Sequence, residues 1–150
     1  MRPDCEMLMG TSTAGIAHAA ITATLLGLPM GYVRGEAKSH GRTNRIEGKL
    51  EPGTKVVVVE DLISTGGSAI ECVEALREAG AEVLGIVSIF TYGMKKGLER
   101  LEAAHTQNHS LCNLDVLVEV AAGEGRIAPE WKARILAFRD NPSDETWIQK

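Results

Sequence analysis

Apolar and amphipathic segments alternate along the first two thirds of this chain of 150 residues. The stretch from Lys55 to Asp61 contains four consecutive valines, which is typical of a strand buried on both faces of a parallel sheet. Shorter apolar runs predict three more strands, at residues 5–9, 29–34 and 81–90. Helices are predicted between and after the strands, at residues 14–26, 68–79 and 95–104. This alternation indicates the α/β class, with an open, mostly parallel sheet flanked by helices.

The remaining segments divide into one polar loop and two helices. Residues 35–51 are polar and basic and have neither helical nor alternating periodicity. The stretch 113–125 places Leu114, Leu117, Val118 and Ala121 on one helical face, with Asn113 as a plausible cap. Residues 128–138 predict a final amphipathic helix. Because ligands of open α/β sheets bind beyond the carboxyl ends of the strands, the segments that follow the strands are the candidate functional residues.

Composition narrows the class of protein. A length of 150 residues predicts one domain, residues 1–150, and a net charge of -4 gives no general electrostatic case for nucleic-acid binding. No segment approaches the roughly 20 apolar residues of a membrane span. The three cysteines form no metal-binding pattern, and the N-terminus has no secretory signal. We therefore expect a soluble, cytoplasmic protein without membrane or nucleic-acid partners.

A cluster of Ser, Thr and Gly follows the valine strand, in the order Glu60-Asp61-Leu62-Ile63-Ser64-Thr65-Gly66-Gly67-Ser68. We call residues 64–68 the phosphate loop, because their glycines permit a close backbone approach and their hydroxyls can donate hydrogen bonds. The loop opens a helix, whose free N–H groups and dipole attract an anion. It lacks the Gly-Lys-Ser/Thr of a Walker motif, so an NTPase site is not predicted. A plain helix cap with a tight turn is the structural alternative.

The adjacent acids Glu60 and Asp61 favour a ligand over a plain cap. Two carboxylates at the end of a buried strand destabilise the core unless they are solvated, paired or bound. Beside a phosphate loop they suit a sugar ring, because carboxylates accept hydrogen bonds from neighbouring hydroxyls, or a magnesium ion held through water. A phosphorylated ribose fits both halves of this motif.

Two other segments have the chemistry of anion binding. Residues 11–15, here called the pyrophosphate loop, carry Thr, Ser and Gly between a strand and a helix, although helix capping alone explains such a cluster. Residues 34–45, here called the basic loop, carry Arg34, Lys38, His40 and two further arginines against one acid. A basic loop can close over an anionic ligand, and a solvated charged loop is the alternative.

These three motifs, in this order, resemble the orotate phosphoribosyltransferases, which are type I phosphoribosyltransferases. "VVVVEDLISTGGS" resembles the motif that binds phosphoribosyl pyrophosphate (PRPP), "YVRGEAKSHGRTNRIEG" the mobile catalytic loop, and "GTSTAGIAHAA" the loop for pyrophosphate. The resemblance implies the fold of the type I core and the transfer of the phosphoribosyl group of PRPP to orotate. It also implies a magnesium cofactor, held mainly by PRPP and water rather than by direct protein ligands, and a homodimer with shared active sites.

The resemblance implies a role for each motif. Glu60 and Asp61 bind the ribose hydroxyls, and the phosphate loop binds the 5′-phosphate, with Leu62 and Ile63 leading into it. Ser64 also lies close to orotate. The pyrophosphate loop, Thr11-Ser12-Thr13-Ala14-Gly15, holds the pyrophosphate with magnesium. Arg34, Lys38 and His40 close over the pyrophosphate across the dimer interface, so that Lys38, His40 and Asp61 are the expected catalytic residues.

The sequence departs from the family pattern in three places. Gly35 stands where many members carry a second loop lysine, and "FTYGMKK" lacks an arginine that some relatives have there. The chain also begins almost at the first core strand, so we expect an N-terminally short domain without the hood that contributes contacts to orotate. Transfer to another base and non-catalytic PRPP binding therefore remain alternative functions.

Overall fold

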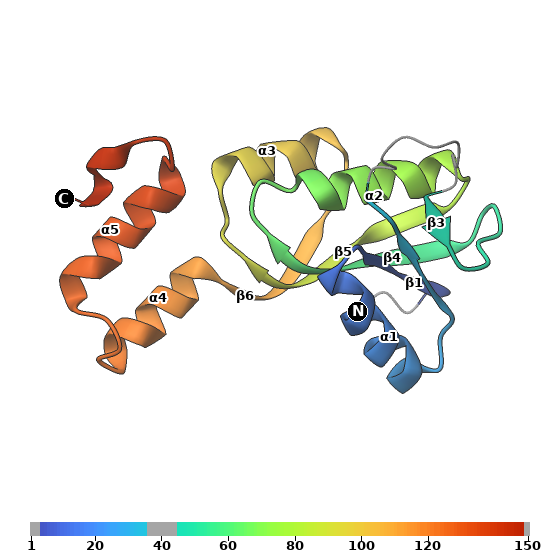
Figure 1. Ribbon diagram of the computed structural model, residues 1–150, viewed down its shortest axis with the longest axis horizontal. Helices are drawn as coiled ribbons and strands as arrows, with labels where there is room; N and C mark the ends of the chain where they lie inside the picture. The colour runs from blue at the N-terminus through green and yellow to red at the C-terminus, as the bar shows by residue number, and fades with distance from the viewer. Residues whose placement is uncertain (1–3, 36–44, 149–150) are drawn as a thin grey trace.

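The structure is a computed structural model and describes residues 4–35 and 45–148. Over these residues the strands form one six-stranded sheet in the order β3-β2-β1-β4-β5-β6 (Figure 1). Neighbouring strands are parallel except for the antiparallel pair β2–β3. The strands are β1 (Met7–Thr11), β2 (Met30–Val33), β3 (Ile46–Glu47), β4 (Lys55–Ile63), β5 (Glu82–Thr91) and β6 (Asn108–Asn113). The prediction of an open, mostly parallel α/β sheet is confirmed.

Helices cover both faces of this sheet. The helix α1 packs on β1, β2 and β4 on one face, whereas α2 and α3 lie together on the other face (Figure 1). The helices α4 and α5 extend away from the sheet beyond β6, where they pack on each other. The bounds are α1 (Ala14–Leu26), α2 (Gly67–Glu78), α3 (Lys95–Ala103), α4 (Leu114–Gly123), α5 (Pro129–Asp140) and a short 3₁₀ helix, η1 (Glu145–Ile148).

Burial on both faces explains the unbroken valine run of β4. Val56 and Val58 point toward α2 and are fully buried, and Val57 and Val59 belong to the second cluster, under α1. Each side of the strand therefore removes apolar surface from water, which stabilises the fold by about 1.5–3 kcal/mol per fully buried side chain. A strand with only one buried face would alternate with polar residues.

The structure corrects several boundaries. The helix at 14–26 is confirmed, and the side chain of Asn113 accepts a hydrogen bond from the Val116 N–H (2.9 Å), as predicted for a cap. The valine strand runs on to Ile63, two residues further than predicted. The strands β3 and β6 were not predicted, because β3 has two residues and the sequence of β6, "NHSLCN", is mostly polar.

The strand at residues 81–90 was predicted to be buried, and this is wrong for part of it. Val87 and Ile89 are 39% and 41% exposed on β5, and Leu111 on the neighbouring β6 is 84% exposed. Register pairs Val87 with Val59, so these residues lie on the face that carries α1, beyond the part that α1 covers.

The described residues also allow a search for membrane-spanning helices and show the state of the three cysteines. Within residues 4–35 and 45–148, no helix is both long and apolar enough to cross a bilayer. Cys5, Cys72 and Cys112 are free, and each is buried or half-buried. Burial is the main cause that raises the pKa of the Cys72 thiol to about 12, so this thiol stays protonated at neutral pH.

Candidate functional site

The site lies where the order of strands reverses. The chain passes from β1 outward to β2 on one side, and β4 takes up the other side of β1. The loops that follow β1 and β4 lead to helices on opposite faces of the sheet (Figure 1). Such a switch point at the carboxyl ends of the strands is where the ligand crevice of open α/β sheets usually lies. The structure thus brings the pyrophosphate loop and the phosphate loop together at this switch point, which we call the crevice.

The phosphate loop forms a small hollow at the start of α2. Gly66 precedes the helix with φ 74°, a left-handed conformation that favours glycine, and no side chain caps the helix. The hollow has a volume of about 90 Å³. It is lined by Glu60 and by residues 62–69. Uncapped N–H groups and the positive end of the helix dipole therefore face a space suited to an anion. The side chain of Ile63 is buried in the core, so only its backbone can reach a ligand.

The adjacent acids Glu60 and Asp61 point to different surroundings. Glu60 is 6% exposed, and its Oε1 accepts hydrogen bonds from the Thr11 hydroxyl (2.6 Å) and the Asp61 N–H (3.0 Å). Asp61 is half-buried. The first carboxyl is thus held inside the protein by the pyrophosphate loop, and the second is the one more accessible from the crevice. Sequence reasoning assigned both acids to the ribose hydroxyls, because their neighbours in space cannot be seen from the chain.

Burial changes the acidity of Glu60. Loss of solvent, together with the neighbouring Asp61 carboxyl, raises the pKa of this carboxyl from its ordinary 4.5 to about 7. The hydrogen bonds from the Thr11 hydroxyl and the Asp61 N–H act in the opposite direction, because they favour the charged form. Glu60 therefore changes its charge near neutral pH, next to a half-buried carboxyl.

The pyrophosphate loop is anchored at both sides. Ser12 donates two hydrogen bonds to the Val33 carbonyl of β2, from its N–H (3.1 Å) and its hydroxyl (2.8 Å). Gly15 is buried against Thr11 and the Val59 carbonyl of β4, whereas Ser12, Thr13 and Ala14 are exposed. The peptide bond between Ser12 and Thr13 is cis. The middle of the loop is therefore exposed while its ends are fixed to the strands.

The basic loop begins and ends on a short hairpin. The Arg34 N–H donates to the Arg45 carbonyl (2.8 Å), and Arg45 Nε donates to the Arg34 carbonyl (3.2 Å). Arg34 Nε also lies 3.3 Å from Glu47 Oε1 of β3, in an ion pair. These contacts fix the two ends of the loop at the carboxyl end of β2. Lys38 and His40 lie outside the described residues.

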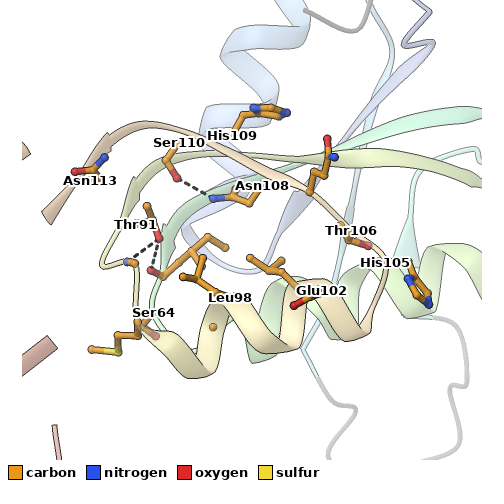
Figure 2. A pocket seen from close by; sticks show the side chains of 16 residues that line it. Ser64, Thr91, Leu98, Glu102, His105, Thr106, Asn108, His109, Ser110 and Asn113 are labelled. Carbon is orange, nitrogen blue, oxygen red and sulfur yellow. Dashed lines mark hydrogen bonds between the residues drawn. The ribbon is translucent and has the colours of Figure 1, made fainter. Parts of the chain in front are cut away.

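A larger cavity of about 840 Å³ lies between α3 and β6 (Figure 2). Ser64 of the phosphate loop and Thr91 of β5 line one end of this cavity, and His105 lies at the other end. The Thr91 hydroxyl donates to the Ile63 carbonyl (3.3 Å) and accepts from the Gly93 N–H (3.1 Å). The contact between β5 and the end of β4 was not visible from the sequence, because it joins residues 28 positions apart.

The donors at the crevice fit a magnesium ion bound through its ligand. Among the described residues, no group of three or more His, Cys, Asp and Glu side chains could hold a metal ion. The crevice does supply the half-buried Asp61 carboxyl beside an anion-binding loop. Magnesium is commonly held by one or two carboxylates, water and substrate phosphates, so these residues suit an ion that arrives with a phosphorylated substrate.

Comparison with known proteins gives the class to which this site belongs. The family described as "Phosphoribosyl transferase domain" matches residues 3–110, which include the pyrophosphate loop, the basic loop and the phosphate loop. The chain thus contains a phosphoribosyltransferase domain, and the three loops lie within it.

Individual relatives narrow the class. An orotate phosphoribosyltransferase of Bacillus cereus (strain G9842) is 60% identical over 146 residues, which cover 97% of this chain and 70% of the relative. The crystal structure of orotate phosphoribosyltransferase from Aeropyrum pernix matches with a TM-score of 0.74 and 32% identity, over 81% of this chain and 70% of that one. The orotate phosphoribosyltransferase from Mycobacterium tuberculosis H37Rv in complex with PRPP matches with a TM-score of 0.63 and 28% identity, over 75% of this chain and 65% of that one. The chain therefore belongs to the orotate phosphoribosyltransferases.

The acidity of Glu60 generates a prediction about stability. Because the pKa of Glu60 is raised to about 7 in the folded protein, this carboxyl binds its proton more tightly there than in the unfolded chain. Its contribution to the free energy of unfolding is complete below about pH 4.5 and is lost as the pH rises through about 7, by on the order of 3 kcal/mol at most. In Glu60→Gln this contribution should be absent, as measured by urea denaturation at pH 5 and pH 8.

The matched control is Glu78→Gln, which removes an exposed carboxyl at the last residue of α2, away from Glu60. We expect the control to follow the pH dependence of the wild-type protein. If Glu60→Gln also followed it, the buried carboxyl would not be the source of the effect.

Proposed function

We propose that this chain transfers the 5-phosphoribosyl group of PRPP to orotate, giving orotidine 5′-monophosphate and pyrophosphate, a step of pyrimidine nucleotide (UMP) synthesis. The observation that carries the proposal is the meeting of the phosphate loop, the pyrophosphate loop and the acid pair in one crevice. PRPP has a phosphate at one end of a ribose and a pyrophosphate at the other, so its shape matches two anion sites on either side of carboxylates. The 60% identity to a named orotate phosphoribosyltransferase supports orotate as the acceptor.

The proposed contacts of PRPP follow from this geometry. The phosphate loop binds the 5′-phosphate through N–H groups at the start of α2 and through hydroxyls. Asp61, with Glu60 beside it, accepts hydrogen bonds from the ribose hydroxyls. The exposed middle of the pyrophosphate loop, residues 12–14, binds the pyrophosphate. PRPP would then lie across the switch point, with its C1 atom above the acid pair.

The reaction breaks the bond between C1 of the ribose and the pyrophosphate oxygen and forms a bond from C1 to a ring nitrogen of orotate. Positive charge develops on the ribose and negative charge on the departing pyrophosphate. Arg34, Lys38 and His40 stabilise the leaving group through their charges, and the acids beside the ring stabilise the cationic sugar. Magnesium, when bound, neutralises the pyrophosphate oxygens and orients them.

Orotate has its proposed place next to the phosphate loop. Ser64 lines both the small hollow and the larger cavity beside α3, so it stands between the ribose site and the space available to a base. The Ser64 hydroxyl is the proposed contact to orotate. Thr91 lies at the same end of the cavity and is a candidate that sequence analysis did not identify.

Assembly and cellular location belong to the same proposal. We propose a homodimer in which the basic loop of each protomer closes over the pyrophosphate of its partner, and a cytoplasmic location. The hairpin supports the homodimer, because it holds both ends of the basic loop at the edge of the sheet.

The experiment that tests the function is a turnover assay. The purified chain, PRPP and magnesium are incubated with orotate, and uracil, hypoxanthine and adenine serve as parallel acceptors. We expect loss of orotate and formation of orotidine 5′-monophosphate with no turnover of the other bases. Turnover of another base would show that this base, and not orotate, is the acceptor. PRPP binding without any turnover would show that the chain is a non-catalytic binder.

The ribose contact predicts the effect of Asp61→Asn. Replacing the carboxylate by an amide removes a charged acceptor, and a hydrogen bond to a charged group contributes about 1.5–3 kcal/mol. The dissociation constant of PRPP should therefore rise at least about tenfold, as measured by titration calorimetry. The control is Asp115→Asn, which alters a carboxylate that pairs with Arg139 in the C-terminal helices. Unchanged affinity in Asp61→Asn would remove Asp61 from the ribose site.

The shared active site predicts recovery of activity in mixed dimers. Lys38→Ala removes the lysine cation of the basic loop, and Asp61→Asn removes the ribose contact. Each homodimer should therefore be nearly inactive. Random exchange of the two variants makes half of the dimers mixed, and each mixed dimer has one intact site out of two. The expected activity is therefore about a quarter of the wild-type activity. No recovery despite confirmed exchange of subunits would show that each site is built from one chain.

A further inference from the structure

The helix α3 packs against the backbone of the phosphate loop. Residues 63–65 present their carbonyl groups to the chain segment that ends β5 and forms α3. The Ile63 carbonyl accepts hydrogen bonds from the Tyr92 N–H (3.0 Å) and the Thr91 hydroxyl (3.3 Å). The Thr65 carbonyl accepts one from Arg100 Nη1 of α3 (3.1 Å). Two of the three carbonyls are therefore held by donors 28 to 35 positions later in the chain.

The third carbonyl, that of Ser64, is fixed by close packing. A Cβ atom added to Gly97 of α3 would lie 2.5 Å from the Ser64 oxygen, closer than such contacts occur. The same atom would lie 3.5 Å from the Ser64 carbonyl carbon and 3.6 Å from that of Thr65. The backbone of α3 thus touches the phosphate loop directly, and only glycine allows this approach.

Fixing these carbonyls also fixes the N–H groups that follow them. A trans peptide unit is planar, and its carbonyl and N–H point in opposite directions. When α3 holds the carbonyls of Ser64 and Thr65, the N–H groups of Thr65 and Gly66 are directed to the opposite side of the loop. N–H groups held in this way can bind an anion without reorganising when it arrives.

The charge of Arg100 adds to this effect. Its Nη1 would lie 3.5 Å from a Cβ atom placed on Gly67, the first residue of α2. A cation next to the positive end of a helix dipole is unfavourable by itself. An anion bound at the start of α2 makes this arrangement favourable, because the anion attracts both the helix end and the guanidinium.

We propose that Gly97 and Arg100 are positioning residues that hold the phosphate loop in the conformation that binds the 5′-phosphate of PRPP. They act through the loop backbone rather than by contact with the reacting atoms. This inference rests on the proposed function, since it assigns the phosphate loop to the 5′-phosphate. The 5′-phosphate does not change during the reaction, so its binding is the same in the ground state and the transition state. Loss of such binding raises KM and leaves kcat almost unchanged.

The test is Arg100→Ala, assayed with varied PRPP at saturating orotate. We expect KM for PRPP to rise about five- to tenfold, as for the loss of one typical hydrogen bond at an exposed position, with kcat within about twofold of wild type. Arg100→Lys restores the charge and one donor and should recover most of the affinity. Gly97→Ala forces α3 away from Ser64 and should raise KM more strongly.

Arg77→Ala is the matched control. Arg77 of α2 also donates to backbone carbonyls, those of Ala104 (2.7 Å) and His105 (3.3 Å), but it holds the end of α3 rather than the phosphate loop. We expect it to lower thermal stability and to leave KM for PRPP unchanged. Equal values of KM for wild type and Arg100→Ala, an equal rise in Arg77→Ala, or a loss confined to kcat would overturn the inference.

The two proposals fail in different ways. If the wild-type chain binds PRPP but has no turnover, the function proposed above fails, and calorimetric titration of PRPP into Arg100→Ala, Arg100→Lys and Arg77→Ala still tests the role of α3. If the wild-type chain turns over orotate and Arg100→Ala has the wild-type KM, only the role of α3 fails.

Discussion

One buried hydrogen bond joins the two halves of the site. The Thr11 hydroxyl lies at the end of β1 and Glu60 lies on β4, and the 2.6 Å bond between them crosses the switch point of the sheet. Both side chains are almost inaccessible to solvent, so water cannot replace either partner without cost. This bond sets the pyrophosphate loop and the phosphate loop at a fixed separation. A ligand with an anionic group at each end of a sugar requires that separation.

The two acids on β4 have different surroundings. Burial raises the pKa of Glu60 to about 7 and gives it an internal partner, whereas Asp61 stays half-buried at the crevice. Neighbouring carboxyls with different environments commonly divide structural and ligand-binding roles in this way. Net charge gives no attraction for an anionic substrate, because the chain carries -4 overall. The proposed PRPP site therefore depends for this attraction on helix N-termini, backbone N–H groups and the basic loop.

Support for the site comes from elements that follow it in the chain. The end of β5 and the helix α3 hold the backbone of the phosphate loop from behind through Thr91, Gly97 and Arg100. The same sheet is covered unevenly, since α2 and α3 lie over one face while Val87, Ile89 and Leu111 remain exposed on the other. The face that supports the phosphate loop is therefore the one with the larger core.

The sequence by itself determined the local features of this protein. The valine run, the Ala- and Leu-rich segment 14–26 and the Ser/Thr/Gly clusters each specify a strand, a helix or a turn through interactions between near neighbours, and the structure agrees with them. The edge strand β6 escaped prediction because its residues are mostly polar, and the apolar residues of β5 did not reveal that part of them face solvent.

Only the tertiary structure decided which of these features work together. The inward turn of Glu60 depends on Thr11, 49 positions away, and the conformation of the phosphate loop depends on Arg100, 35 positions away. Contacts over such distances arise from the packing of strands and helices and leave no periodic trace along the chain. The residue types of the site were therefore predictable, whereas their orientation, acidity and support were decided by the fold.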